Sequence, residues 1–243
     1  MAGAADFTLS IVSHRHNRMI NSLLQDIGRH CGGEARVILT ENVPDPVAVS
    51  TENLSFPVET IVNRGPKGFG ANHNAAFKRC RTPLYCVLNP DVRFGSDPLF
   101  PLSRALADER VGVVGPLVRN PEGTPEDSAR IFPTLGSLLR RAFHEPAGPG
   151  YPIDRGPLEV DWIAGMFMLF RREAYAAVGG FDEGYFLYYE DVDICRRLRA
   201  KGFGVVYDPR TEIVHDARRA SRGSPRLAWH HLKSVLRFLS RGR

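Results

Sequence analysis

Short apolar, β-rich runs alternate with helical patterns along the first half of the chain. Four of these runs predict strands, at residues 7–13, 35–39, 58–62 and 84–88. Behind the first run, apolar residues recur at helical spacing from Ile20 to Ile27, and Asn17 is expected to cap that helix. A second helix is expected behind the third run, reaching Cys80. Strands that alternate with helices indicate an α/β fold with a mostly parallel central sheet flanked by helices.

The second half of the chain has a less regular pattern. Proline and glycine punctuate residues 116–160, so this stretch is expected to be mostly loop, with one helix around 135–143. The apolar run at 160–170 predicts one buried strand, and the spacing at 190–201 predicts a helix that ends at a glycine. Short strands are expected at 205–207 and again just before His215.

No internal repeat or linker interrupts these patterns, so we expect one domain over residues 1–221 and a C-terminal helix at 222–243. No apolar run reaches the roughly 20 residues that a membrane-spanning helix needs. The N-terminus lacks the order of basic and apolar residues that marks a secretory signal. The four cysteines are scattered without a CxxC pair, which argues against a zinc site or disulfide framework and fits a reducing cytosol.

Charge changes this picture only at the C-terminal end. The whole chain carries +5, yet eight arginines and lysines and no carboxylate side chain follow Asp216, so the body is net acidic. Five apolar residues recur near helical spacing among those cations: Trp229, Leu232, Val235, Leu236 and Leu239. The pattern predicts a basic amphipathic helix. Two interpretations carry equal weight: the helix lies on an anionic membrane, or it packs on the body or in a homodimer. Because the cations are confined to one end, nucleic acid is not an expected partner.

Candidate chemistry lies in the loops that follow the strands, where parallel sheets bind their ligands. Asp91 follows the fourth strand within the sequence Asn89-Pro90-Asp91. A carboxylate there suits Mg²⁺ or Mn²⁺ bridged to a diphosphate, although these three residues alone are more typical of a turn. His215 ends a predicted strand, and imidazole suits Mn²⁺ better than Mg²⁺, although a lone histidine is more often structural.

Three carboxylates, Glu190, Asp191 and Asp193, open the helix that follows an aromatic run at 185–189. A helix N-terminus favours acidic residues, but three in four positions exceed what a cap requires. One of them, partly desolvated beside the aromatic rings, is therefore a candidate general base.

Glycines at 65, 68 and 70 precede the second helix but do not follow the G-x-G-x-x-G order, and they come after the third strand. A dinucleotide-binding fold is therefore not expected. Close approach of the backbone to a ligand and a simple turn both remain open.

Three segments, taken in order, resemble the inverting family 2 glycosyltransferases of the GT-A fold, specifically their bacterial rhamnosyltransferase-like branch. They are GFGANHNAAF at 68–77, LNPDV at 88–92 and WIAGMFMLFRREAYAAVGGFDEGYFLYYEDVDICRR at 162–197. The resemblance runs from Phe7 to about Ser221. It implies a Rossmann-like single domain with a nucleotide-sugar donor half at about 1–115 and an acceptor half at 116–221.

The resemblance also implies an activity. A sugar, foremost L-rhamnose from dTDP-rhamnose, would move from a nucleotide diphosphate donor to a hydroxyl of a glycan or a polyprenyl-diphosphate-linked acceptor. Such transfer builds bacterial cell-surface polysaccharide, in the cytoplasm or at the inner face of the plasma membrane. The alternatives are another hexose donor, such as UDP-glucose or UDP-galactose, and nucleotide-sugar binding without catalysis.

Residue roles follow from the same resemblance. Asp191 matches the catalytic base, which Glu190 supports. Asp91 matches the last acidic position of the family's metal motif and His215 a downstream metal ligand, while Asn89 replaces the motif's first acidic residue. Donor binding is implied for Ser13, Glu41, Gly68, Gly70, Asn74, Asn89 and Asp91. Acceptor binding is implied for Trp162, Gly165 and Asp182.

Overall fold

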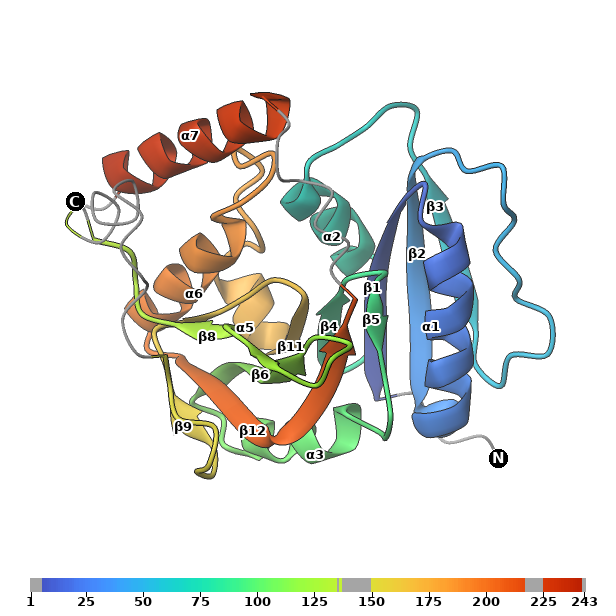
Figure 1. Ribbon diagram of the computed structural model, residues 1–243, viewed down its shortest axis with the longest axis horizontal. Helices are drawn as coiled ribbons and strands as arrows, with labels where there is room; N and C mark the ends of the chain where they lie inside the picture. The colour runs from blue at the N-terminus through green and yellow to red at the C-terminus, as the bar shows by residue number, and fades with distance from the viewer. Residues whose placement is uncertain (1–5, 135, 137–149, 217–224, 242–243) are drawn as a thin grey trace.

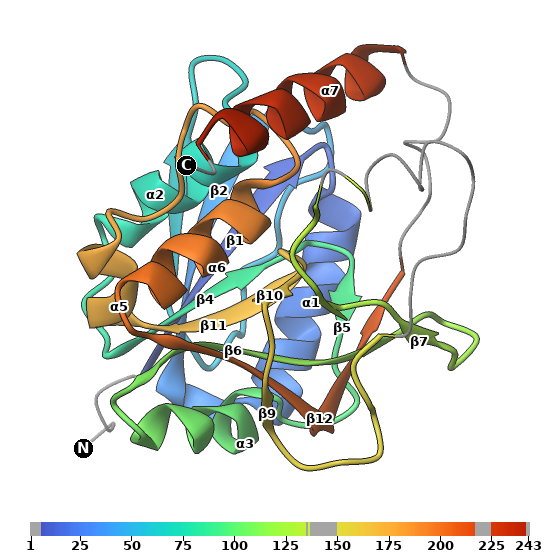
Figure 2. The same cartoon turned by 90° about the vertical axis from the view of Figure 1, so that its left-hand side faces the viewer.

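A mixed β-sheet with helices on both faces forms the centre of the molecule (Figures 1 and 2). The computed structural model describes residues 6–134, 136, 150–216 and 225–241. Apart from residue 136, the helix expected around 135–143 lies outside these residues. The strand order of the main sheet is β3-β2-β1-β4-β11-β6-β12-β5.

The first four long strands are parallel, as the alternating pattern predicts. They are β1 (Phe7–His14), β2 (Ala35–Val43), β3 (Val58–Val62) and β4 (Leu84–Leu88). Next to β4, strand β11 (Phe167–Arg171) enters antiparallel and also pairs with β6 (Val111–Arg119). Beyond it, β12 (Gly204–His215) runs parallel to β6, and the two-residue β5 (Val92–Arg93) closes that edge.

Four very short strands complete the sheets. β7 (Pro125–Glu126) pairs with β6, β9 (Leu158–Glu159) pairs with β12, and β8 (Ala129–Arg130) pairs with β10 (Trp162–Ile163) in a separate two-stranded sheet.

Two layers of helices bury the apolar residues that alternate along the strands. On β4, Cys86 and Leu88 belong to one core cluster, whereas Tyr85 and Val87 belong to the other. The first cluster lies under α1 (Asn17–His30) and α3 (Leu99–Ser103). The second lies under α2 (Phe69–Phe77), α5 (Arg172–Ala177) and α6 (Glu190–Ala200). Short 3₁₀ turns occupy Gly32–Glu34 and Ala105–Ala107, and α7 (Pro225–Ser240) lies above α6 (Figures 1 and 2).

Several sequence predictions need correction. The single strand expected at 160–170 is two strands, β10 and β11, because the chain turns at residues 164–166. The two strands expected near 205–215 are one strand, β12, which a register shift between Asp208 and Glu212 bends. Strand β6 extends into the stretch expected to be loop, and the expected boundary between residues 115 and 116 falls inside it.

The ends of two helices also differ from the prediction. Asn17 is the first residue of α1 and does not cap it; its side chain accepts a hydrogen bond from Ser13 Oγ and donates to the carbonyl of Val47. Helix α2 ends at Phe77, before Cys80. No helix in the described parts of the chain is long and apolar enough to cross a membrane.

Candidate active site

The carboxyl ends of β1 and β2 carry the first predicted donor residues side by side. Ser13 and Glu41 are partners in the register of these strands. Ser13 is fully buried, and its hydroxyl also accepts a hydrogen bond from the backbone NH of His16. The strand ends therefore fix the start of the loop that precedes α1.

Buried asparagines organise the neighbouring loop, a feature that the sequence analysis missed. Asn63 Nδ2 donates to Asn42 Oδ1 at 2.9 Å and to Asn72 Oδ1 at 2.7 Å. Asn42 Oδ1 also accepts the backbone NH of Lys67, and Asn72 donates to the carbonyl of Gly68. Asparagine near the end of β2 and just after β3 was the available signal, since a buried amide must find partners. The network holds the chain between β3 and α2 in one conformation.

Two adjoining pockets lead from these loops to Asp91. The first, of about 650 Å³, is lined by Arg15, His16, Arg18, Met19 and residues 44–47. The second, of about 210 Å³, is lined by Arg18, Met19, Ser22, Pro90, Asp91, Arg93 and Asp216. Arg18 and Met19 line both pockets, so they form one path. Its arginines suit an anionic ligand such as a diphosphate.

Asp91 and His215 face one another at the end of that path. Asp91 Oδ1 lies 3.3 Å from His215 Nε2, is buried, and accepts no hydrogen bond from the described residues. On the other ring nitrogen, His215 Nδ1 lies 3.0 Å from Glu126 Oε2. Burial alone would lower the pKa of His215, but the two carboxylates outweigh it and raise that pKa.

This arrangement fits a divalent cation. A carboxylate that holds Nδ1 of a histidine directs Nε2 toward a metal, and here Nε2 points at a carboxylate oxygen without a hydrogen-bond partner. Within the described residues, no three His, Cys, Asp or Glu side chains are arranged to hold a metal by themselves. Two protein ligands are sufficient where substrate phosphates and water supply the rest. Asn89, at the first position of the family's metal motif, has an uncharged side chain and adds no negative charge to this site.

The turn between β10 and β11 connects this half of the site to the predicted base. The backbone NH of Gly165 donates to Asp191 Oδ2 at 3.0 Å. The next residue, Met166, accepts the backbone NH of Asn89 at 3.0 Å through its carbonyl. Two consecutive residues therefore tie the acidic start of α6 to the loop that carries Asp91.

The pair Glu190 and Asp191 opens α6 in an apolar setting. Burial raises the pKa of Asp191, and the hydrogen bonds from Gly165 and Val192 oppose that rise only in part. Glu190 is only 5% exposed, and its Oε2 has no hydrogen-bond partner among the described residues. Burial and the nearby charge of Asp191 raise the pKa of Glu190 well above its usual range. Of the two, Glu190 is therefore the one that more strongly favours its protonated form, while the more accessible Asp191 is suited to receive a proton.

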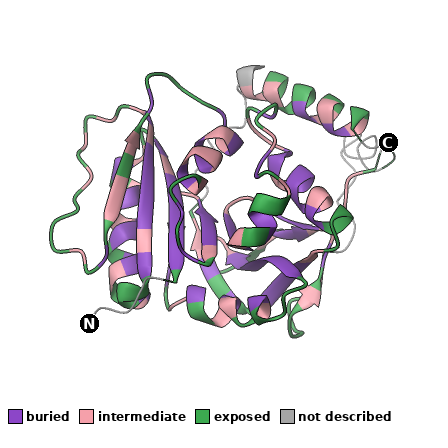
Figure 3. Cartoon of the chain, turned by 180° about the vertical axis from the view of Figure 1, so that it is seen from behind, coloured by how far each residue is buried: buried purple, intermediate pink, exposed green. Residues whose placement is uncertain are grey.

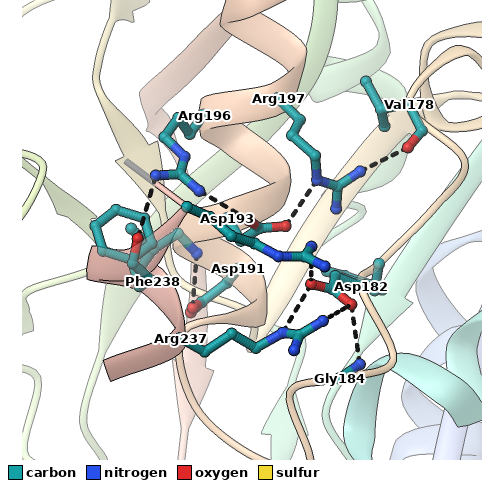
Figure 4. Close-up of polar contacts among 12 residues, drawn as sticks. Val178, Asp182, Gly184, Asp191, Asp193, Arg196, Arg197, Arg237 and Phe238 are labelled. Carbon is teal, nitrogen blue, oxygen red and sulfur yellow. Dashed lines mark hydrogen bonds and ion pairs between the residues drawn. The ribbon is translucent and has the colours of Figure 1, made fainter. Parts of the chain in front are cut away.

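The third carboxylate, Asp193, is paired with two arginines of its own helix. Asp193 is buried and lies 3.2 Å from Arg196 and 2.7 Å from Arg197. Arg197 in turn donates to the carbonyl of Val178 (Figure 4). Asp193 is thus occupied in holding α6 against its surroundings.

Arg130 lines a pocket together with His215 and packs on Trp162. The guanidinium of Arg130 lies over the Trp162 ring at 5.0 Å, and the indole NH donates to the carbonyl of Ile131. A third pocket, of about 440 Å³, is lined by Asn120, Thr124, Pro125, Glu126, Asp127, Arg130, Met166 and His215. Met166 and His215 place this pocket next to the Asp91 side of the site. Arg130 was not predicted, because nothing in its local sequence marks it.

Four predicted ligand contacts have other partners in the structure. Asn74 bonds to the backbone NH and carbonyl of Phe181 and to the hydroxyl of Tyr175. A Cβ at Gly68 would lie 2.7 Å from the carbonyl oxygen of Phe186, and one at Gly70 would lie 2.6 Å from Cβ of Phe181.

These two glycines therefore allow close approach of another part of the protein, residues 181–189. We call this segment the strap. The fourth residue, Asp182, lies in the strap and pairs with Arg237 and Arg241 of the C-terminal region. A donor contact of Asn74 and an acceptor contact of Asp182 thus have no support in this geometry.

The fold and site together define a nucleotide-sugar glycosyltransferase of the GT-A type. Residues 5–228 match the model of the family described as glycosyltransferase like family 2, and the chain belongs to this family.

Relatives of known name agree with this assignment. The chain is 38% identical to the N-acetylglucosaminyl-diphospho-decaprenol L-rhamnosyltransferase of Mycobacterium tuberculosis (strain CDC 1551 / Oshkosh), over 96% of this chain and 78% of that protein. It is 30% identical to the rhamnosyltransferase WbbL of Escherichia coli (strain K12), over 96% of this chain and 92% of that protein.

Solved structures show the same fold at low sequence identity. The mannosyltransferase PcManGT from Pyrobaculum calidifontis, in complex with GDP-Man and Mn²⁺, superimposes with a TM-score of 0.70 at 15% identity, covering 99% of this chain and 66% of that chain. TarS of S. aureus in complex with UDP gives 0.65 at 11% identity, covering 95% and 64%.

Proposed function

We propose that this glycosyltransferase moves an L-rhamnosyl residue from a nucleoside diphosphate donor, dTDP-rhamnose, to a hydroxyl of a polyprenyl-diphosphate-linked sugar. The relatives at 38% and 30% identity are named as rhamnosyltransferases, and the first is named for a lipid-diphosphate acceptor. The product would serve cell-surface polysaccharide synthesis.

One observation carries the catalytic part of the proposal: the turn at Gly165 and Met166 bonds to Asp191 on one side and to Asn89 on the other. A donor diphosphate beside Asp91 and an acceptor hydroxyl beside Asp191 would therefore share one cleft. Transfer across such a cleft needs the base and the leaving group at opposite ends of the reacting bond.

The chemistry follows from these positions. The acceptor oxygen forms a bond to the anomeric carbon as the bond from that carbon to the diphosphate breaks. The departing nucleoside diphosphate takes the electron pair, and the carboxylate of Asp191 takes the acceptor proton. Its raised pKa suits it to accept that proton. A single displacement inverts the anomeric carbon.

Asp91 and His215 would hold a divalent cation, Mg²⁺ or Mn²⁺, with Glu126 fixing the imidazole. When bound, such a cation neutralises charge on the diphosphate. Arg18 lines the path to Asp91 and adds positive charge on the protein's side.

Transfer assays with Asp191→Asn test this assignment. We expect the variant to bind dTDP-rhamnose like the wild type, measured by thermal shift with Mn²⁺, and to transfer nothing to a polyprenyl-diphosphate-linked N-acetylglucosamine. Asp154→Asn is the matched control, since that aspartate is exposed and distant in sequence. Turnover of Asp191→Asn at the wild-type rate would refute the base. A larger thermal shift with UDP-glucose, UDP-galactose or GDP-mannose would refute the donor.

A lipid-linked acceptor also gives a role to the outer face of α7. Helix α7 carries exposed positions, drawn green in Figure 3. Among its residues, Trp229, Leu232 and Leu236 are 55%, 49% and 59% exposed and follow one another at i, i+3 and i+7. The ammonium of Lys233 lies 5.1 Å from the Trp229 ring centroid. Apolar residues with flanking cations suit a peripheral contact with anionic lipid, and we extend the proposal to such a contact.

Vesicle sedimentation tests the membrane contact. The triple variant Trp229→Ser, Leu232→Ser, Leu236→Ser should bind less to vesicles that contain phosphatidylglycerol. The control is Phe100→Ser, at an exposed aromatic residue on α3, and it should leave binding unchanged. Equal sedimentation of both variants and the wild type would exclude this contact.

A further inference from the structure

The inner face of α7 contacts the strap along most of its length. Ser234 is buried and donates to the carbonyl of Leu187 at 2.9 Å. The ring of His230 stacks on Phe186, with centroids 4.6 Å apart and an interplanar angle of 21°. The C-terminal helix is therefore fastened to the strap by polar and aromatic contacts at once.

The strongest of these contacts is an ion pair at the start of the strap. Arg237 donates to both carboxylate oxygens of Asp182, at 3.0 and 2.9 Å (Figure 4). Arg241 adds a further contact to the same carboxylate. Partial burial opposes ionisation, but the hydrogen bonds from Arg237 and Gly184, together with the charges of Arg237 and Arg241, outweigh it and lower the pKa of Asp182. A side chain at Gly184 would collide with the guanidinium of Arg237, so this glycine makes room for the ion pair.

The strap ends in a backbone conformation that needs support. Tyr188 and Tyr189 have φ values of 71° and 70°, in the left-handed region that bulky residues rarely adopt. Such a conformation persists only where the surrounding structure holds it. His231 lies 5.5 Å from each tyrosine ring, and Phe238 lies 5.5 Å from Tyr189. Both supporting rings belong to α7.

The residue after this strained pair is Glu190, and Asp191 follows it. The direction in which α6 presents the two carboxylates is therefore set by the strap. On its other side the strap bonds to α2, where the NH of Phe69 donates to the carbonyl of Phe186 at 2.9 Å. The strap thus lies between α2, which follows the donor loops, and α7.

We propose that α7 is a positioning element of the active site: by clamping the strap through Arg237 and Asp182, it holds Glu190 and Asp191 in their working orientation. This inference rests on the proposed function only because it takes Glu190 and Asp191 to act on the acceptor. A helix that is a mere appendage, or only a lipid anchor, would not have this effect.

The test compares two single changes that each remove one positive charge. Arg237→Gln removes the ion pair, whereas Lys201→Gln removes an equal charge from an exposed residue just after the end of α6. We expect Arg237→Gln to lower kcat about ten- to hundredfold, as for a displaced catalytic group, with little change in the KM for donor. Lys201→Gln should keep the wild-type kcat, and Arg237→Lys should recover part of the loss.

Hydrogen exchange of the intact protein provides a readout that needs no substrate. In Arg237→Gln, amides of the strap and the first turn of α6 should exchange faster, while those of β1 and β4 should match the wild type. If strap exchange in Arg237→Gln equals that in Lys201→Gln, the proposal is overturned, whatever sugar is transferred. An unchanged kcat in a folded Arg237→Gln variant would also overturn it. Failure of the wild type to transfer rhamnose would instead overturn only the proposed function.

Discussion

Glu190 is expected to cost the folded protein stability at neutral pH. Its carboxyl is buried, lacks a partner at Oε2 among the described residues, and lies beside Asp191. Because its pKa is raised on folding, the native state holds a proton that the unfolded chain releases. Below the unfolded pKa of Glu190, about 4.3 for glutamate, this residue does not reduce the free energy of unfolding. As the pH rises toward the folded pKa of Glu190, the free energy of unfolding falls.

The size of the effect follows from proton linkage. One proton held only by the native state changes the free energy of unfolding by about 1.4 kcal/mol per pH unit. In a domain of this size, about 1 kcal/mol moves the melting temperature by about 2–4 °C. Glu190→Gln should therefore gain about 3–6 °C per pH unit over the wild type across the interval in which Glu190 titrates.

The assay is a series of melting temperatures between pH 4 and pH 9 for the wild type, Glu190→Gln and Glu122→Gln. Glu122 is exposed, so its variant reports the effect of losing one surface carboxylate. The difference between Glu190→Gln and the wild type should be near zero at pH 4, grow with pH and then level off. A difference that does not depend on pH, or a Glu190→Gln variant that is less stable at pH 8, would refute the reasoning.

Three further predictions concern other parts of the site and its frame. Asp26→Asn should lower the free energy of unfolding by about 2–3 kcal/mol in urea denaturation, because buried Asp26 holds Arg93 at 2.6 Å and the NH of Phe94. Gly70→Ala should lower it by about 1–3 kcal/mol in the same assay, since its Cβ would press on the strap. Asp91→Ala should remove the Mn²⁺-dependent part of donor binding, measured by calorimetry with and without the ion; an undiminished Mn²⁺ effect would count against that ligand.

The strands that could be predicted are those whose signal is local. In β1 and β4 the apolar runs are bounded by polar or turn residues, so each strand can be located from its own segment. The break between β10 and β11 could not be predicted, because Ala164, Gly165 and Met166 continue the apolar run without a polar residue. Strand β6 contains Pro116, which favoured a loop, yet it is paired on both sides.

In the candidate site, the family motif named Asp91 and His215, which lie 3.3 Å apart. Their role as metal ligands stays a prediction. The partners of other predicted residues could not be inferred from the local sequence. The packing of Gly68 and Gly70 depends on a strap more than 100 residues away, and so does the position of Asn74. No local pattern distinguishes a glycine that admits a ligand from one that admits another part of the backbone.

The place of β11 in the sheet has a consequence for how the chain is made. It lies between β4 and β6, yet both of those strands leave the ribosome before it does. Until β11 arrives, each presents an apolar edge with unpaired backbone groups, the kind of surface that joins wrongly to other chains. We therefore expect the nascent protein to expose these strand edges until its eleventh strand has been made.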